Sequence, residues 1–185
     1  MRKKVMIIVG SLRERSFNKQ LAQVIAKELE HEVEVEILEY SNIPYMNQDI
    51  EFPAPLVIQA LREKMEKVDG YYIITPEYNG SYPGLLKNLL DWMSRTIKPN
   101  DFEHGSPVTN RKVAIAGAGG RAAAIGAREK LDELLRFMGM DVMEQQLGLA
   151  LSGESFMKDE MILSYEDQGK IKEHVRAYLS FLGNM

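Results

Sequence analysis

Short apolar segments alternate with amphipathic helical patterns along the chain, and this alternation limits its possible folds more than any other feature. The predicted strands are Val5–Val9, Val33–Ile37, Gly70–Thr75, Lys112–Ala116 and Asp141–Gln145. Helices are predicted through Leu21–Leu29, from Pro55 to Val68, from about Pro83 to Arg95, from Ala122 to Met138 with Gly139 as its cap, and from Ser164 onward. Strands joined by helices predict a parallel sheet, because each crossover returns the chain in the same direction.

The polarity of the five strand segments predicts their order in the sheet. Segments one, three and four are apolar throughout, whereas two and five are half polar, as expected at the edges. The order 2-1-3-4-5 puts those two at the edges, and it is the flavodoxin-like form of the doubly wound α/β fold, a five-stranded parallel sheet with helices on both faces. Ligands bind such sheets beyond the carboxyl ends of the strands. The loops after Val9, Thr75 and Ala116 are therefore the candidate site.

Length and charge restrict the class of protein. The 185 residues predict a single domain that spans residues 1–185. Acidic residues outnumber basic ones by 27 to 23, and the net charge of −4 argues against a nucleic-acid partner, which needs a basic surface. No apolar segment is long enough to cross a membrane, and the N-terminus does not resemble a signal peptide, so we expect a cytoplasmic location.

Residues that carry metal or covalent chemistry are scarce in the sequence. There is no cysteine, which excludes disulfides, thiolate metal centres and a cysteine nucleophile. The three histidines, His31, His104 and His174, are far apart in the sequence. We therefore expect no metal site, and we expect the histidines at the surface or at helix ends.

The first loop, Gly10–Asn18, leaves a buried strand and enters a helix, so unpaired N–H groups and the positive end of the helix dipole face it. Ser11, Ser16 and Asn18 add short donors, and Arg13 adds a guanidinium that binds two phosphate oxygens at once. The loop lacks the Gly-Lys-Ser/Thr ending of a triphosphate site and the glycines of a dinucleotide site. It predicts a terminal monophosphate. The alternative is a plain N-cap at Ser16 or Asn18, with Arg13 in solvent.

The second loop, Thr75–Gly84, is rich in proline, glycine and tyrosine. It can present backbone N–H groups and aromatic faces to a flat heterocycle. Alternatively, Asn79-Gly80 is an ordinary tight turn, and the leucine-rich helix behind it belongs to the core. That helix is apolar over more than one stripe, so Leu85–Trp92 predicts a subunit interface and a homodimer or homotetramer.

Three motifs together resemble the NADPH-dependent FMN reductase family, which includes flavin, azo, quinone and chromate reductases. They are Gly10-Ser-Leu-Arg-x-x-Ser-x-Asn18, Pro76-Glu-Tyr-Asn-Gly80 and Leu86-Lys-Asn-x-Leu-Asp91-Trp, within a similarity that runs from Lys4 to about Met140. The resemblance implies bound FMN. By resemblance, the FMN phosphate is held by Ser11, Arg13, Ser16 and Asn18. The isoalloxazine ring is lined by Pro76, Glu77, Tyr78, Asn79 and Gly80, with a backbone N–H near flavin N5.

The third loop, Ala116–Arg121, is rich in glycine, and Gly117-x-Gly119-x-x-Ala122 matches a dinucleotide-binding pattern. It follows the fourth strand, however, where the sheet has no switch point. The resemblance implies instead that Gly117, Gly119 and Gly120 approach the polar edge of the flavin. Many family members have a serine near the start of this segment, whereas this chain has Gly117-Ala118, so the donors here would be backbone groups. Helix–strand packing and a nicotinamide dinucleotide site are the alternatives.

The predicted function is hydride transfer from NADPH or NADH to FMN and on to a small-molecule acceptor: a flavin, a quinone, an azo compound or a metal oxyanion. No catalytic side chain is predicted, because the cofactor carries this chemistry. The alternatives are a flavodoxin-like electron carrier, a flavin-based redox sensor, and a dehydrogenase without flavin that uses the Gly117 loop. The segment Leu147–Met161 fits no motif.

Overall fold

The strands in the described residues all run parallel in one sheet, whose main path has the order β2-β1-β3-β4-β5. The structure is a computed structural model that describes residues 2–101 and 103–183. The strands are β1 (Lys4–Val9), β2 (Glu34–Ile37), β3 (Gly70–Ile74), β4 (Lys112–Gly119), β5 (Asp141–Val142) and β6 (Leu147–Ala150). The predicted flavodoxin-like order is confirmed, and the switch point lies between β1 and β3.

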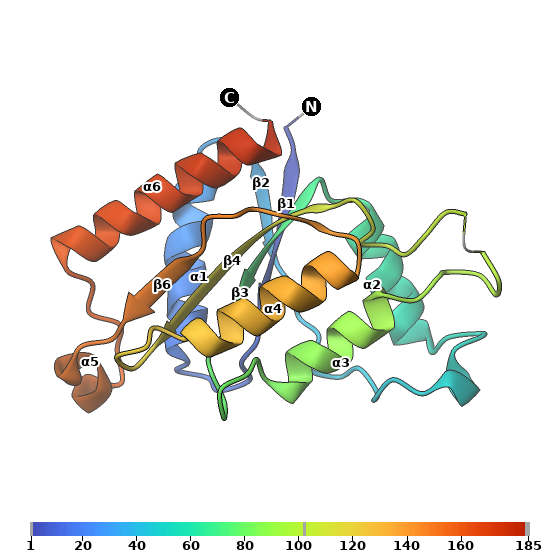
Figure 1. Cartoon of the computed structure of the whole chain (residues 1–185), viewed down its shortest axis with the longest axis horizontal. Coiled ribbons are helices and arrows are strands. Elements are labelled where there is room, and N and C mark those ends of the chain that lie inside the picture. Colours follow the sequence, from blue (N-terminus) through green and yellow to red (C-terminus); the bar gives the residue numbers. More distant parts are fainter. Residues whose placement is uncertain (1, 102, 184–185) are drawn as a thin grey trace.

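Helices cover both faces of the sheet (Figure 1). They are α1 (Phe17–Leu29), α2 (Leu56–Glu66), α3 (Gly84–Met93), α4 (Ile125–Phe137), α5 (Gly153–Lys158) and α6 (Tyr165–Leu182), with a 3₁₀ turn, η1, at Gln48–Ile50. Side chains of β1 alternate between two cores: Met6 and Ile8 pack with α2, α3 and α4, whereas Val5 and Ile7 pack with α1 and α6. None of the described helices combines the length and the apolar character that a bilayer span needs.

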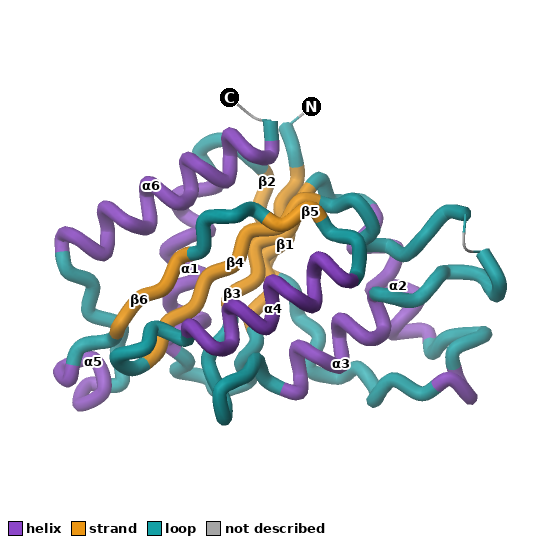
Figure 2. The backbone as a smooth tube through the Cα atoms, viewed as in Figure 1, coloured by secondary structure: helices purple, strands orange, loops and turns teal. Residues whose placement is uncertain are grey.

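The predicted fifth strand, Asp141–Gln145, is too long, and the sheet has a sixth strand that the sequence analysis missed. β5 pairs with the start of β4 and ends at Val142, and β6 pairs with the other end of β4 (Figure 2). Two of the polar residues between β5 and β6 make hydrogen bonds to helices instead of to β4. The carbonyl of Gln145 accepts a hydrogen bond from His174, and Oε1 of Gln146 accepts one from Arg128. The edge therefore consists of two short strands.

The helix predicted from Ala122 begins three residues later, at Ile125. Ala123 and Ala124 have φ angles of 48° and 57°, in the left-handed region that alanine normally avoids. Nε of Arg128 donates to the carbonyl of Ala123 at 3.1 Å and supports this turn. Alanine has a high helix propensity. The run of alanines at 122–124 therefore predicted helix, but in the structure these residues belong to the third loop.

The apolar residues of α3 are accounted for within the chain. Leu86, Leu89, Leu90, Trp92 and Met93 are all buried in the core beside the sheet. Their second stripe therefore gives no support to the predicted subunit interface at Leu85–Trp92. The homodimer or homotetramer stays a prediction.

His174 is 1% exposed, so the expectation that all three histidines lie at the surface or at helix ends is wrong for this one. Its Nε2 lies 2.9 Å from the carbonyl of Gln145, which can only accept, and its Nδ1 contacts the hydroxyl of Tyr72. These two bonds fit a neutral ring with the proton on Nε2. Burial is the main cause that lowers the pKa of His174 to about 4; the charge of Arg128 acts in the same direction, and the hydrogen bond to Gln145 acts against it.

The depressed pKa of His174 predicts a pH-dependent stability. The unfolded chain takes up a proton near the ordinary histidine pKa of about 6.5, whereas the folded chain does so near 4. The contribution of His174 is therefore complete above about pH 6.5 and is lost as the pH falls toward 4. Thermal unfolding between these values should show a smaller fall in Tm for His174→Gln than for the wild type. His31→Asn, at an exposed position, should follow the wild type, and identical profiles for all three proteins would contradict the assignment.

Candidate functional site

The three predicted loops meet in one cleft of about 410 Å³ at the carboxyl ends of β1, β3 and β4. Nine of the predicted site residues line it: Ser11, Arg13, Ser16, Asn18, Pro76, Glu77, Tyr78, Gly119 and Gly120. Asn79, Gly80 and Gly117 do not. The cleft is also lined by seven residues that are not among these predicted FMN ligands: Phe17, Ala118, Arg121, Ala122, Ala124, Leu151 and Phe156.

The first loop brings an open helix N-terminus to the cleft. Ser16 is the N-cap of α1, but its hydroxyl makes no capping hydrogen bond. The first helical bond runs from the N–H of Gln20 to the carbonyl of Ser16, so the N–H groups of Phe17, Asn18 and Lys19 lack partners within the helix. The uncapped hydroxyl and these N–H groups form a site suited to an anion.

Asn18 ties the first loop to the third. Its side chain is 3% exposed, and it donates to the carbonyl of Ala118 at 3.0 Å and accepts from the N–H of Ala118 at 2.9 Å. Both polar atoms of the amide are therefore used in a pair of backbone contacts. Asn18 fixes the distance between two walls of the cleft.

The second loop contains a tight turn whose tip, Asn79-Gly80, is not among the residues that line the cleft. Tyr78 and Ser81 exchange backbone hydrogen bonds of 2.9 and 3.1 Å, and the φ angles of Asn79 and Gly80 are 53° and 69°. Positive φ at both central residues is the type I′ turn that Asn-Gly favours. Asn79-Gly80 thus forms a tight turn, while Pro76, Glu77 and Tyr78 line the cleft.

Glu77 binds the backbone at the start of α4. Its Oε2 accepts a hydrogen bond from the N–H of Ala127 at 3.2 Å, in the first turn of the helix. A carboxylate is stabilised there by the free N–H groups and by the dipole. This bond joins the second loop to the first turn of α4, whereas the bonds of Asn18 join the first loop to the third.

The glycines of the third loop have different roles. A Cβ at Gly117 would lie 2.7 Å from the carbonyl oxygen of Thr75 and 3.0 Å from the Cβ of Ala124, so this position requires glycine for packing between β4, β3 and the loop. A Cβ at Gly120 would meet no atom within 4 Å. Gly119 and Gly120 face the cleft, where a ligand can approach the backbone closely.

The segment Leu147–Met161, which fits no motif, forms one wall of the cleft through Leu151 and Phe156. The ring of Phe156 packs edge-on against Phe17, with ring centroids 5.4 Å apart. Two local signals in the sequence predict its structure. Leu147 and Leu149 alternate with smaller residues as in a strand, and Ser152 caps α5 by accepting from the N–H of Ser155.

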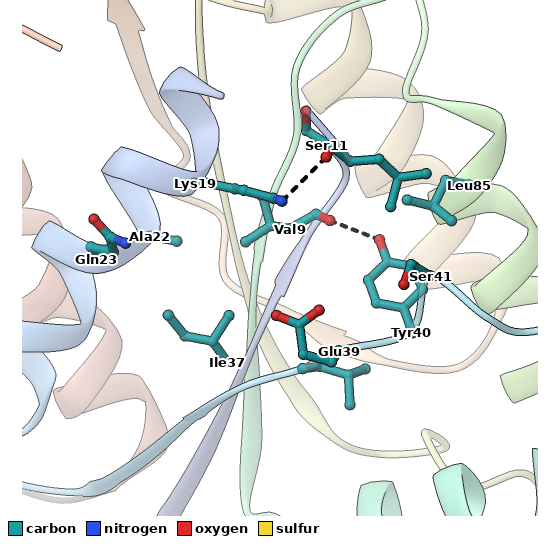
Figure 3. Close-up of a pocket in the computed structure, with 12 residues that line it drawn as sticks. Val9, Ser11, Lys19, Ala22, Gln23, Ile37, Glu39, Tyr40, Ser41 and Leu85 are labelled. Atoms are coloured by element: carbon teal, nitrogen blue, oxygen red, sulfur yellow. Dashed lines mark hydrogen bonds between the residues drawn. The ribbon is translucent and has the colours of Figure 1, made fainter. Parts of the chain in front are cut away.

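A second, smaller pocket of about 190 Å³ lies on the other side of the first loop, between α1 and the ends of β1 and β2 (Figure 3). The hydroxyl of Tyr40 donates to the carbonyl of Val9 at 2.8 Å, and Nζ of Lys19 donates to the carbonyl of Leu12 at 3.3 Å. These polar groups hold the backbone where β1 ends. This pocket therefore adjoins the first loop, and Ser11 lines both cavities.

The donor set of the larger cleft fits a flavin mononucleotide. At one end are the hydroxyls of Ser11 and Ser16, the α1 N-terminus and Arg13, which suit a phosphate. At the other end are Pro76, the half-exposed ring of Tyr78, and backbone at Gly119 and Gly120, which suit a flat ring with polar edges. Among the described residues no group of His, Asp or Glu side chains is placed to hold a metal ion.

Comparison with known proteins gives consistent matches. The model of the NADPH-dependent FMN reductase family matches residues 3–153. A quinone reductase from Pseudomonas putida is 30% identical over 176 residues, which are 95% of this chain and 88% of the relative. A 2-hydroxy-1,4-benzoquinone reductase from Burkholderia sp. is 42% identical over 92 residues, which are 50% of this chain and 50% of the relative. The solved structure of FerB, a flavoenzyme NAD(P)H:(acceptor) oxidoreductase from Paracoccus denitrificans, covers 98% of this chain and 97% of its own, with a TM-score of 0.85 and 28% identity.

Proposed function

The chain belongs to the NADPH-dependent FMN reductase family, and on that premise we propose that it is an NAD(P)H-dependent quinone reductase with bound FMN. The observation that carries this proposal is the single cleft in which an open helix N-terminus, Arg13 and the Pro76–Tyr78 segment face one another. The quinone as acceptor is supported by the relatives from Pseudomonas putida and Burkholderia sp., which are named quinone reductases.

The first loop would hold the phosphate of FMN. Ser11, Ser16 and the α1 N–H groups would donate to its oxygens, and Arg13 would add a charge-assisted bond. Asn18 keeps the third loop in place by its two bonds to Ala118. Asn18 therefore acts on the phosphate end mainly as a positioning residue, and its predicted direct contact with phosphate stays a proposal.

The second and third loops would hold the ring. Pro76, Glu77 and Tyr78 lie along the cleft, and the backbone at Gly119 and Gly120 faces it from the opposite wall. Bound FMN would supply the hydride-transfer chemistry between NAD(P)H and the acceptor. The chain fixes the ring and leaves one face accessible. Contacts of Asn79, Gly80 and Gly117 with the ring also stay proposals.

Anaerobic reduction tests this function directly. The purified protein, loaded with FMN, should lose its visible flavin absorption when mixed with NADPH or NADH in a stopped-flow instrument. A quinone added afterward should restore the absorption. Both substrates would use the same face of the ring in turn, which predicts a ping-pong mechanism. Initial rates measured against NAD(P)H concentration at several fixed quinone concentrations should therefore give parallel lines in double-reciprocal plots.

Two outcomes would replace this proposal by one of its alternatives. Bound FMN that neither NADPH nor NADH reduces would indicate an electron carrier or a redox sensor. A protein that stays colourless after FMN is offered, yet oxidises a nicotinamide, would indicate a flavin-free dehydrogenase. The single FMN-binding domain, the homodimer or homotetramer and the cytoplasmic location stay predictions from the sequence.

A further inference from the structure

A carboxylate already binds the arginine that is expected to hold the FMN phosphate. Nη1 of Arg13 lies 2.6 Å from Oδ1 of Asp159, and Nε of Arg15 lies 3.5 Å from Oδ2 of the same side chain. Asp159 thus bridges two arginines of the first loop from a segment more than a hundred residues away in the sequence. A carboxylate and a phosphate bind a guanidinium through the same charge-assisted bonds, so Asp159 and the phosphate compete for these donors.

The backbone of Asp159 is anchored by hydrogen bonds to Ser155, which places its side chain beside the first loop. Asp159 ends α5 in the left-handed region, with φ of 50°, and its N–H donates to the carbonyl of Ser155. The N–H of Glu160 donates to the same carbonyl, and the hydroxyl of Ser155 accepts from the N–H of Ile162 at 3.1 Å. Ser155 itself is fully buried. The turn after α5 therefore has a fixed course beside the first loop.

Aromatic contacts hold the two segments together. The guanidinium of Arg13 lies over the ring of Phe17, 5.1 Å from its centroid, and Phe156 of α5 packs against the same ring. The N–H of Met161 donates to Oε1 of Gln20 in α1 at 2.7 Å. Arg13 therefore contacts both Phe17 and Asp159 at the edge of the cleft, with about half of its side chain, 48%, exposed.

We propose that Asp159 sets the flavin selectivity of the site, because its negative charge opposes the phosphate of FMN at Arg13 and Arg15. The inference rests on the proposed function. A phosphate carries between about one and a half and two negative charges at neutral pH. With Asp159 beside it, the phosphate adds less to binding than the two arginines alone would allow. The preference for FMN over riboflavin is thereby reduced, and FMN leaves the site faster.

The substitution Asp159→Asn removes the charge and keeps the size and the hydrogen-bonding oxygen. Asparagine also tolerates the left-handed conformation of this position. Titrations of the flavin-free protein, followed by flavin fluorescence, should give a dissociation constant for FMN about three- to tenfold lower than that of the wild type, the scale of one partly exposed charge interaction. The constant for riboflavin, which has no phosphate, should not change. The rate of FMN release should fall by a similar factor.

Two controls separate this effect from general charge. Glu154→Gln removes a negative charge from the same helix, where Glu154 pairs with Lys158 at 2.6 Å rather than with the arginines, and it should leave FMN binding unchanged. In an Arg13→Ala background, Asp159→Asn should gain less than in the wild type, because one of its partners is gone.

The results distinguish failure of the inference from failure of the proposed function. Wild-type protein that binds FMN with an affinity that Asp159→Asn leaves unchanged or weakens would overturn the inference alone. An equal gain for riboflavin, or an equal effect of Glu154→Gln, would overturn it as well. Wild-type protein that binds neither flavin would overturn the proposed function, and the inference with it.

Discussion

Arg13→Ala is expected to weaken FMN binding by about 1.5–3 kcal/mol, or roughly 10- to 150-fold in the dissociation constant. Arg13 lines the cleft beside the open N-terminus of α1, and its guanidinium is held in place by Phe17 and Asp159. Its removal takes away the charge-assisted bonds to phosphate, while Asp159 keeps Arg15 as its partner. Fluorescence titration of the flavin-free variant measures the effect.

The loss of affinity in Arg13→Ala should be specific for FMN. Riboflavin affinity should change little in Arg13→Ala, because riboflavin has nothing to offer the guanidinium. Arg176→Ala removes an exposed arginine of α6 outside the cleft, and it should leave FMN binding as in the wild type. FMN affinity that Arg13→Ala leaves unchanged would remove Arg13 from the phosphate site.

Gly117→Ala is expected to reduce the free energy of unfolding by about 2–3 kcal/mol, which is the scale of overpacking in a core. The added Cβ would stand 2.7 Å from the carbonyl of Thr75, which is part of the backbone where β3 ends. It would also press on Ala124, in the left-handed turn before α4. Relief requires a shift of β3 or of the third loop. Urea denaturation at an unchanged m-value measures the cost.

Gly120→Ala is the matched control in the same loop. A Cβ there meets no atom within 4 Å, so its stability should stay within about 0.5 kcal/mol of the wild type. Equal stability of Gly117→Ala and the wild type would mean that Gly117 is not needed for packing. Its role would then have to be the approach to a ligand that the resemblance implies.

The architecture of the sheet could be predicted because burial leaves a strong pattern in the sequence. Central strands such as β3 are apolar at every position, while the edge strand β2 alternates with charged residues. Strand order and the position of the ligand loops follow from that contrast. Nine of the twelve residues proposed from those loops line one cleft.

Other features depend on contacts between distant parts of the chain, which no local pattern records. Ala123 and Ala124 adopt left-handed conformations that Arg128 supports from the next turn. His174 can be buried because Tyr72 and Gln145 satisfy both of its ring nitrogens. Asp159 reaches Arg13 only after β6 and α5 have been placed beside α1.

A crystal structure with FMN tests the central claim most directly. We expect the phosphate at the N-terminus of α1, bonded to Ser16 and Arg13, and the ring between the Pro76–Tyr78 segment and the backbone of Gly119 and Gly120. FMN bound elsewhere on the molecule, or bound in this cleft with its phosphate far from Arg13, would contradict the account.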